Sequence, residues 1–202
     1  MQLYREKADS YWCRRLHHHK RFYNDEEERR KWQNPEAILS EIGLKKGSIF
    51  VDVGCGEGFF AVPAARIVGK NGRVYALDID EESIAILREK AAKEGLRNLV
   101  TRVGAAEEMV LCEVCADFVF FGIVLHDFRN VSRVLQNAKK MLKPTGLVAD
   151  LDWKKEPMQF GPPVNIRFNE TQAAGLLDKA GFEVEEAKEM GLYHYLILAK
   201  LH

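Results

Sequence analysis

Short apolar runs alternate along this chain with longer stretches in which apolar residues recur every three or four positions. The short runs, bounded by glycine or charged residues, are typical of buried strands, and the longer stretches are typical of helices with one buried face. We predict strands at 48–53, 73–78, 99–103, 116–121, 146–152, 182–189 and 192–200. We predict helices near 58–68, 81–94, 130–142 and 170–180.

This alternation predicts an α/β fold, in which a seven-stranded, mainly parallel sheet carries helices on both faces. The last two predicted strands are joined by only a few residues around Met190, too few for a helical crossover. They should therefore pair as an antiparallel hairpin. A chain of 202 residues suits one domain with a single core.

The first predicted strand runs directly into three glycines at alternate positions, Gly54, Gly56 and Gly58. Glycine lets the backbone turn tightly, so the end of the strand and the start of the next helix share a crevice that can hold a ligand. The spacing differs from the G-x-G-x-x-G pattern of NAD-binding proteins, because Phe59 stands in the place of the third glycine. The Gly-Lys-Ser/Thr sequence of a phosphate-binding loop is also missing. An ordinary strand–helix turn is the plainer alternative.

Acidic residues around this turn narrow the choice of ligand. Asp52 precedes the turn and Glu57 lies inside it, where carboxylates repel a pyrophosphate but suit a ligand that carries an ammonium and a sulfonium. Asp78 ends the next strand, about 20 residues after the glycines, where a carboxylate can accept hydrogen bonds from both ribose hydroxyls. Asp80 has the simpler role of capping the following helix.

At this point the chain resembles the class I S-adenosylmethionine-dependent methyltransferases, in particular the small-molecule branch that includes the ubiquinone/menaquinone-biosynthesis-type enzymes. The resemblance covers roughly residues 34–200. It rests on four segments, which are Val51–Gly58, Val74–Asp80, Gly122–Phe128 and Met141–Val148. It implies a single methyltransferase domain with a Rossmann-like core over 36–202. An N-terminal helical cap over 1–35 would lie over the cofactor and help to form the substrate pocket.

The cap has its own sequence pattern. Apolar residues recur at every fourth position, as on one face of a helix, at Tyr4, Ala8, Trp12 and Leu16. The histidines His17–His19 and the charged run Asp25–Lys31 follow. A packing helix followed by a solvated charged face is the alternative to a pocket-forming segment.

The resemblance implies S-adenosyl-L-methionine as cofactor and S-adenosyl-L-homocysteine as product. The implied contacts come from Asp52, Gly54, Cys55, Gly56, Asp78, Ile79, Ala105, Ala106, Glu107 and Gly122. Asp52 would orient the ammonium end, Asp78 would hold the ribose and Ile79 would pack on the adenine. Ala105 stands where many relatives have Asp, so backbone groups or Glu107 would have to accept the hydrogen bond of the adenine amine.

The catalytic requirements of such a reaction are modest. Methyl transfer is a displacement at a carbon that is already activated, so the protein mainly positions the nucleophile, and a general base is needed only if that nucleophile must lose a proton. His126, after the fourth strand, is the candidate for this base or for orienting the substrate. Asp127 lies beside it, although adjacent side chains usually point apart. No metal site is predicted, because no histidine pair at i, i+4 spacing with a carboxylate is found.

Two further segments leave alternatives open. Cys112 and Cys115 form a C-x-x-C, which suits a redox pair, half of a zinc site or a simple loop with two thiols. Residues 157–168 contain prolines that exclude a regular helix, so this connection is either a functional lid or a packed connector. Together with Trp153 and Tyr193–Tyr195 it would make an aromatic substrate wall.

Composition limits the partners. With 30 basic and 30 acidic residues the formal net charge is zero, which argues against a general polyanion binder such as a nucleic-acid protein. No stretch is apolar enough to span a bilayer, and the N-terminus lacks the apolar core of a signal peptide, so we expect a cytoplasmic protein. We predict an S-adenosylmethionine-dependent methyltransferase that acts on a small-molecule acceptor as a monomer or homodimer. An NAD-dependent oxidoreductase and a non-catalytic S-adenosylmethionine-binding protein stay open as alternatives.

Overall fold

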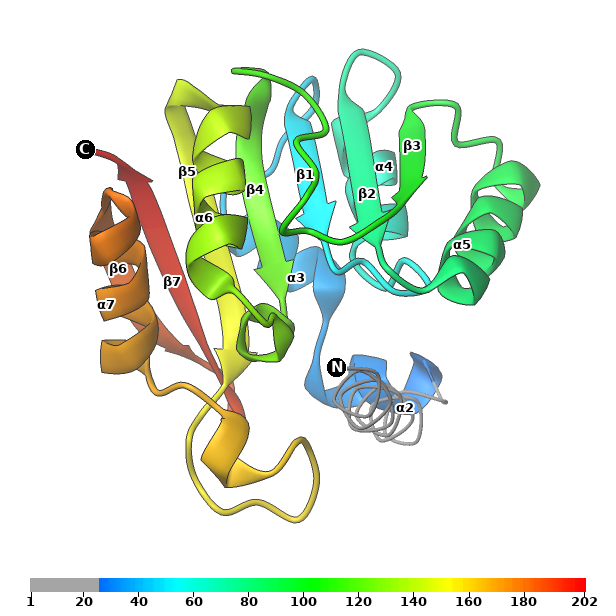
Figure 1. The fold of residues 1–202 in the computed structure, drawn as a ribbon. Helices are drawn as coiled ribbons and strands as arrows, with labels where there is room; N and C mark the ends of the chain where they lie inside the picture. The colour runs from blue at the N-terminus through cyan, green and yellow to red at the C-terminus, as the bar shows by residue number, and fades with distance from the viewer. Residues whose placement is uncertain (1–25) are drawn as a thin grey trace, which may run out of the picture.

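The computed structural model describes residues 26–202, which fold around one seven-stranded sheet (Figure 1). The strands are β1 (Ile49–Val53), β2 (Arg73–Asp78), β3 (Leu99–Val103), β4 (Ala116–Gly122), β5 (Leu142–Trp153), β6 (Phe182–Met190) and β7 (His194–Leu201). The helices are α2 (Glu26–Trp32), α3 (Pro35–Glu41), α4 (Ala61–Val68), α5 (Glu81–Lys93), α6 (Val131–Met141) and α7 (Glu170–Ala180). Two short 3-10 turns, η1 (Leu125–Asp127) and η2 (Val164–Ile166), complete the described part.

The strand order is β3-β2-β1-β4-β5-β7-β6. The pairs β3–β2, β2–β1, β1–β4 and β4–β5 are parallel, whereas β7 pairs antiparallel with both β5 and β6. The predicted fold class is therefore confirmed, including the terminal antiparallel hairpin. The order reverses between β1 and β4, which is the switch point where open α/β sheets bind their ligands.

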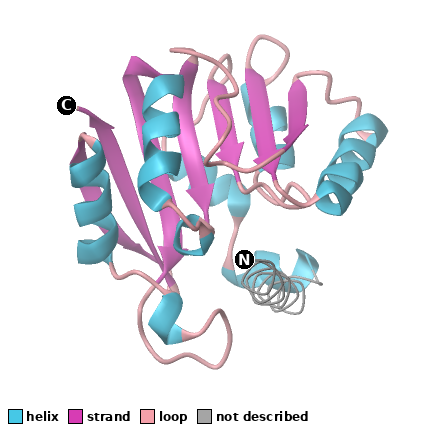
Figure 2. Ribbon diagram, viewed as in Figure 1, coloured by secondary structure: helices cyan, strands magenta, loops and turns pink. Residues whose placement is uncertain are grey.

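Helices cover both faces of the sheet, with α6 and α7 on one side and α4 on the other (Figure 2). The two faces hold separate cores, because alternate side chains of each strand point in opposite directions. Along β4, Phe118 and Phe120 pack in the core under α3, α4 and α5, whereas Val119 and Phe121 pack in the core under α6 and α7. Both cores are built almost wholly from aliphatic and aromatic side chains, which is the main driving force for this fold.

Most predicted boundaries lie within a few residues of the observed ones, and β5 is the largest exception. It begins at Leu142 rather than at residue 146, and its pairing with β4 changes register between Ala116 and Phe118. Gly146 lies at this irregularity, where an added Cβ would stand 2.7 Å from the carbonyl oxygen of Ala116. The early part of β5 therefore depends on a close backbone approach that the apolar pattern does not reveal.

Two helices before the sheet were not predicted as separate elements. Asn34 caps α3 by accepting a hydrogen bond from the N–H of Ala37, and Pro35 occupies the first helical turn, where its missing N–H costs nothing. The charged run over 25–31 falls largely within α2. The predicted helix face at Tyr4–Leu16 and the histidines His17–His19 lie outside the described residues.

The carboxyl ends of the parallel strands point to one edge of the sheet, and α2 lies at that edge (Figure 1). The connections after β1, β2, β4 and β5 all start there. The C-x-x-C is at the opposite edge, just before β4, and the structure joins Cys112 and Cys115 in a disulfide with a Cα–Cα separation of 5.9 Å. Between residues 26 and 202, no helix combines the length and the apolar character needed to cross a membrane.

One buried acid of β5 offers a test of the core. Asp150 has no exposed surface, and neither of its carboxyl oxygens has a hydrogen-bond partner among residues 26–202. Burial, and then the nearby charge of Asp152, raise the pKa of Asp150 well above its usual value. The folded protein therefore keeps a proton that the unfolded chain loses above about pH 4.

We predict that this acid makes the protein less stable as the pH rises from about 4 toward neutrality. The expected loss from this group is on the order of 1 kcal/mol of unfolding free energy per pH unit. Asp150→Asn should remove that contribution and flatten the pH dependence measured by urea unfolding. Asp178→Asn, at a side chain that is 74% exposed, is the control and should follow the wild-type curve. Parallel curves for Asp150→Asn and wild type would show that Asp150 is ionised in the folded protein.

Candidate functional site

The glycine-rich turn after β1 is held against the end of β2. The N–H groups of Gly54 and Cys55 both donate to the carbonyl oxygen of Leu77, at 2.8 and 3.0 Å. All three glycines have positive φ, with values of 76°, 52° and 89° for Gly54, Gly56 and Gly58. This left-handed backbone explains why glycine is needed at alternate positions.

The glycines differ in what surrounds them. A Cβ on Gly54 would lie 2.5 Å from Cγ2 of Val124, and one on Gly58 would lie 2.3 Å from Cδ1 of Leu87. A Cβ on Gly56 would meet nothing within 4 Å. Two of the glycines therefore permit close packing inside the protein, whereas Gly56 presents bare backbone to open space.

Asp52 and Asp78 both lie close to this turn. Asp52 is 1% exposed, and its Oδ2 has no hydrogen-bond partner in the described part of the chain. Burial, and then the charge of Asp78, raise the pKa of Asp52 to about 8. Asp78 accepts hydrogen bonds from the N–H groups of Gly56, at 2.7 Å, and Asp80, at 2.9 Å. Asp78 thus fixes the turn through its hydrogen bonds. Asp52, next to the turn, keeps a buried carboxyl oxygen that makes no hydrogen bond within the described residues.

Beyond Asp78, apolar side chains stand exposed at the ends of β2 and β3. Ile79 is 62% exposed, and Val103, which pairs in register with Asp78, is 38% exposed. Ile79 was predicted to contact the ligand, whereas Val103 was missed. The signal for Val103 was its position as the last residue of the adjacent parallel strand. Both residues thus leave apolar surface exposed next to Asp78 in sequence or register, and apolar surface near a carboxylate suits a flat heterocycle attached to a sugar.

The loop after β3 borders the same surface. The N–H of Gly104 donates to the carbonyl oxygen of Asp78 at 2.9 Å, and the amide of Asn137 donates to the carbonyl oxygens of Ala106 and Glu107, at 2.9 Å each. The carboxylate of Glu107 accepts from two backbone N–H groups of the segment after β4. Glu107 therefore links the loop after β3 to the segment after β4. Together with the hydrogen bond from Asn137 to Ala106, this holds the loop that contains Ala105 and Ala106 at the carboxyl edge of the sheet.

The segment after β4 carries backbone strain. Ile123 has a φ of 65°, which is rare for a β-branched residue, and its N–H donates to the carbonyl oxygen of Leu151 at 2.7 Å. Gly122 precedes it, where an added Cβ would lie 2.6 Å from the ring of Phe120. Strain of this kind is held in place by surrounding contacts and concentrates at functional sites.

His126 follows in η1 and is buried. Its Nδ1 lies 2.8 Å from Oδ2 of Asp152 on β5, and its Nε2 lies 3.6 Å from Oδ1 of Asp127. Asp152 also accepts a hydrogen bond from the N–H of Trp153 at 2.7 Å. The closer orienting partner of His126 is therefore Asp152, which was missed, although its position at the carboxyl end of β5 was a usable signal. Asp127, the neighbour in sequence, lies farther from the ring than Asp152, as expected for adjacent side chains that point apart.

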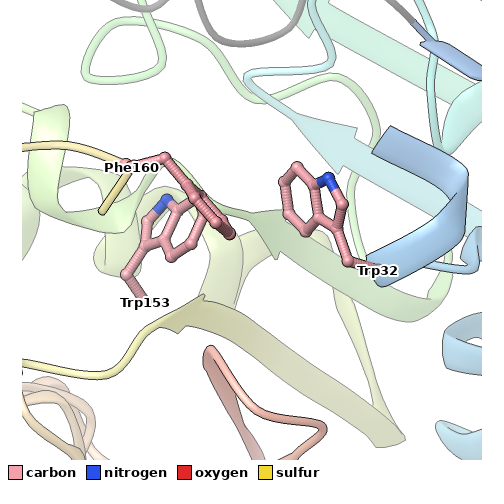
Figure 3. Close-up of a pocket in the computed structure, with 4 residues that line it drawn as sticks. Trp32, Trp153 and Phe160 are labelled. Atoms are coloured by element: carbon pink, nitrogen blue, oxygen red, sulfur yellow. The ribbon is translucent and has the colours of Figure 1, made fainter. Parts of the chain in front are cut away.

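A group of aromatic rings lies at the carboxyl edge of the sheet, next to the end of β5 (Figure 3). The rings of Trp32 and Trp153 have centroids 5.6 Å apart, and each also lies within 6 Å of the ring of Phe160. These three side chains and Gly161 line a hollow of about 100 Å³. Of the predicted aromatic wall, Trp153, Tyr193 and His194 join this group, and Trp32 was missed.

Tyr195 does not belong to the wall. It packs in the core under α6 and α7, because alternate residues of β7 face opposite sides of the sheet.

Arg167 organises the connection between β5 and α7. Its buried guanidinium donates to the carbonyl oxygens of Lys154, Glu156, Phe160 and Pro162. It also lies 5.4 Å from the ring centroid of Trp153. The connection contains no α-helix, as its prolines predicted. The hydrogen bonds of the Arg167 guanidinium hold it in place instead. This bonding places Phe160 beside Trp153.

Residues 44–188 match the family model described as a methyltransferase domain. The chain belongs to this methyltransferase family. A solved structure of a SAM-dependent methyltransferase from Aquifex aeolicus is 33% identical in sequence, with a TM-score of 0.82 over 86% of this chain and 93% of that chain. The recognised resemblance and the class I methyltransferase fold are thereby confirmed.

Two curated relatives match parts of this methyltransferase domain. One is the probable cobalt-precorrin-6B C(15)-methyltransferase (decarboxylating) of Pyrobaculum calidifontis, 42% identical over 85 residues, or 42% of this chain and 44% of that protein. The other is the demethylmenaquinone methyltransferase of Geobacillus kaustophilus, 29% identical over 131 residues, or 65% of this chain and 55% of that protein. The matched regions span about half the length of these relatives.

The different surroundings of the glycines give a test of this methyltransferase turn. Gly56→Ala should cost about 1–2 kcal/mol of unfolding free energy, because it adds only the strain of a left-handed alanine. Gly54→Ala should cost about 1–3 kcal/mol more, since its methyl group overlaps Val124. Urea unfolding measures both losses. Val124→Ala in the Gly54→Ala background should recover the extra loss, and a failure to recover any of it would contradict the assigned overlap.

Proposed function

We propose that this chain binds S-adenosyl-L-methionine at the carboxyl ends of β1 and β2 and transfers its methyl group to a small molecule. The observation that carries the proposal is the order of groups along this edge. A buried acid with an unused oxygen, Asp52, is followed by the open backbone at Gly56, the carboxylate of Asp78 and the exposed side chain of Ile79. This order matches the ammonium, the chain, the ribose and the adenine of the cofactor.

The fit extends to the rest of the proposed site. Gly54, Cys55 and Gly56 would hold the methionine part against their backbone, and Gly122 would lie beneath it. Ala105 and Ala106 would offer backbone groups to the polar edge of the adenine. Glu107 would hold this loop in place, because its carboxylate already binds two backbone N–H groups.

When bound, S-adenosyl-L-methionine supplies an electrophilic methyl group, and S-adenosyl-L-homocysteine remains after transfer. The chain contributes position, since holding the nucleophile near attack distance can provide several kcal/mol. We assign His126 as the group that accepts a proton from the acceptor or orients it, with Asp152 holding the imidazole ring through Nδ1. The buried pair gives the ring one fixed orientation.

A cytoplasmic location and a monomeric or homodimeric state stay predictions from the sequence. The small-molecule acceptor is favoured because the two curated relatives are named for a corrin precursor and a menaquinone precursor. The family match and the acids at the turn disfavour an NAD-dependent oxidoreductase.

Calorimetric titration tests the cofactor assignment. S-Adenosyl-L-methionine and S-adenosyl-L-homocysteine should bind the purified chain with micromolar dissociation constants, and NADH should give no comparable heat. Tight binding of NADH alone would overturn the proposal. Incubation with methyl-labelled cofactor and a broad panel of metabolites separates catalysis from mere binding, because reproducible transfer would eliminate the non-catalytic alternative.

Asp78 provides a sharper test. Asp78→Asn preserves the shape of the side chain but replaces one acceptor oxygen by a donor, so the affinity for S-adenosyl-L-methionine should fall by about 1–3 kcal/mol. Asp80→Asn is the matched control, because asparagine also caps helices well and the substitution removes the same charge nearby. Its affinity should stay within about twofold of wild type. Equal affinities for wild type and a folded Asp78→Asn protein would refute the ribose assignment.

Asp52 should make cofactor binding release a proton. With its pKa raised to about 8, Asp52 is neutral in the free protein below that pH, and a bound ammonium favours its ionised form. Calorimetry at about pH 6.5 in buffers of different ionisation enthalpy should therefore show release of close to one proton per bound S-adenosyl-L-methionine. The release should vanish in Asp52→Asn. The same proton count in both proteins would rule out Asp52 as the partner of the ammonium.

A further inference from the structure

The aromatic hollow beside β5 is a second feature of the same edge, distinct from the glycine-rich turn. Its walls come from three separate parts of the chain, with Trp32 from α2, Trp153 from the end of β5, and Phe160 and Gly161 from the connection that Arg167 holds (Figure 3). His194 lies against both tryptophan rings, with centroid distances of 5.7 and 4.4 Å. A volume of about 100 Å³ is on the scale of one six-membered ring.

The hollow is connected to the glycine-rich turn through α2. The guanidinium of Arg29, one helical turn before Trp32, lies 3.7 Å from the ring centroid of Phe59 in that turn. Arg29 also donates to the amide oxygen of Gln33 at 2.7 Å. The same short helix therefore contacts the turn on one side and forms a wall of the hollow on the other.

Two residues at the hollow have buried nitrogens without partners. Among residues 26–202, Nε1 of Trp153, which lines the hollow, and Nε2 of His194, which lies against both tryptophan rings, have no hydrogen-bond partner. Nε2 of Gln33, the residue after Trp32, also has none, and all three side chains are at most 2% exposed. Two of these atoms can only donate, because indole nitrogen carries a hydrogen and the Gln33 oxygen is already taken by Arg29. Unused buried donors favour a ligand that brings acceptor oxygens.

The charges around the hollow also favour a ligand with acceptor oxygens over a cationic one. Burial, and then the positive charges of Arg29, Arg167 and Lys154, lower the pKa of His194 to about 3. His194 is therefore neutral. Lys154 is ion-paired with Glu189 at 2.9 Å, so the guanidinium groups of Arg29 and Arg167 are the charges that disfavour a cationic guest. An aromatic cage without such neighbours would suit a quaternary ammonium group.

We propose that this hollow binds the methyl acceptor and that the acceptor is a planar aromatic molecule with a phenolic oxygen. The inference rests on the proposed function for its chemistry. The phenolic oxygen forms a bond to the methyl carbon, and the carbon–sulfur bond breaks and leaves its electron pair on sulfur. The phenolic proton passes to His126, or to water where His126 only orients the acceptor. The rings supply a flat apolar surface, the unused N–H groups supply donors to the oxygen, and the nearby cations favour its ionised form.

Binding experiments test this inference with three probes of similar size: 4-nitrophenol, the cation benzyltrimethylammonium and the non-planar cyclohexanecarboxylate. We expect 4-nitrophenol to quench the tryptophan fluorescence and to bind at least tenfold more tightly than either of the others. Tighter binding of benzyltrimethylammonium would overturn the charge assignment, and tighter binding of cyclohexanecarboxylate would overturn the planar one.

Two phenylalanines of the same connection make a matched pair of variants. Phe160 lines the hollow, whereas Phe168 packs against the core on the other face of the sheet. Phe160→Ala should weaken 4-nitrophenol binding at least tenfold, and Phe168→Ala should change it less than twofold. Trp153→Phe keeps an aromatic ring but removes the N–H, and should weaken binding severalfold. Equal binding by Phe160→Ala and wild type would place the acceptor elsewhere.

Parallel titrations with S-adenosyl-L-homocysteine separate this inference from the proposed function. If the cofactor product binds all variants equally while 4-nitrophenol binding depends on Phe160, both stand. If the product binds but 4-nitrophenol does not, the acceptor assignment alone is wrong. If 4-nitrophenol binding depends on Phe160 but neither cofactor form binds, the hollow is a phenol site and the proposed methyl transfer is wrong.

Discussion

The carboxyl end of β2 holds the whole binding edge together. The carbonyl oxygen of Leu77 accepts hydrogen bonds from Gly54 and Cys55, and the carboxylate of Asp78 accepts from Gly56 and Asp80. The carbonyl oxygen of Asp78 accepts a further bond from Gly104. Two consecutive residues thus fix the turn after β1, the entry to α5 and the loop after β3. If the end of β2 moved, all three segments would lose their anchor at once.

Two buried acids lower the stability of the folded protein. Asp52 and Asp150 each lie fully inside the protein with at least one unpartnered oxygen among residues 26–202, and burial raises the pKa of both. Neither is explained by packing, because a buried polar group without a partner costs free energy. At Asp52 the cost is accounted for by the proposed function, which places the ammonium group of the cofactor next to this acid. The structure offers no such explanation for Asp150, which interacts electrostatically with Asp152 and with the buried hydroxyl of Tyr195.

The features that the sequence predicted well are local in the chain. The two periodicities located the strands and helices, and the short join near Met190 correctly indicated an antiparallel hairpin. The glycine-rich turn could be read because its residues are consecutive and because left-handed backbone leaves a signature in residue type. Asp78 followed from its fixed place at the end of the next strand.

The features that escaped prediction join distant segments. Asp152 holds His126 across 26 residues, and Trp32 meets Trp153 and His194 only after the sheet has formed. No periodicity marks such contacts, because each depends on which elements the topology brings together. The cysteine pair is a local exception, since the sequence left three alternatives open for two residues only three positions apart, and the structure joins Cys112 to Cys115. Of the four residues that line the hollow, Trp153, Phe160 and Gly161 lie in segments that the sequence assigned to an aromatic wall, whereas Trp32 was missed because α2 meets these segments only in the folded protein.

A single edge of the sheet is thus proposed to hold both the methyl donor and its acceptor. The most direct test is a crystal structure of the full chain with bound S-adenosyl-L-homocysteine. The account predicts the ribose hydroxyls on the carboxylate of Asp78, the amino group at Asp52 and the sulfur atom facing the hollow between Trp32 and Trp153. A ligand bound away from the glycine-rich turn, or a sulfur atom turned away from that hollow, would contradict it.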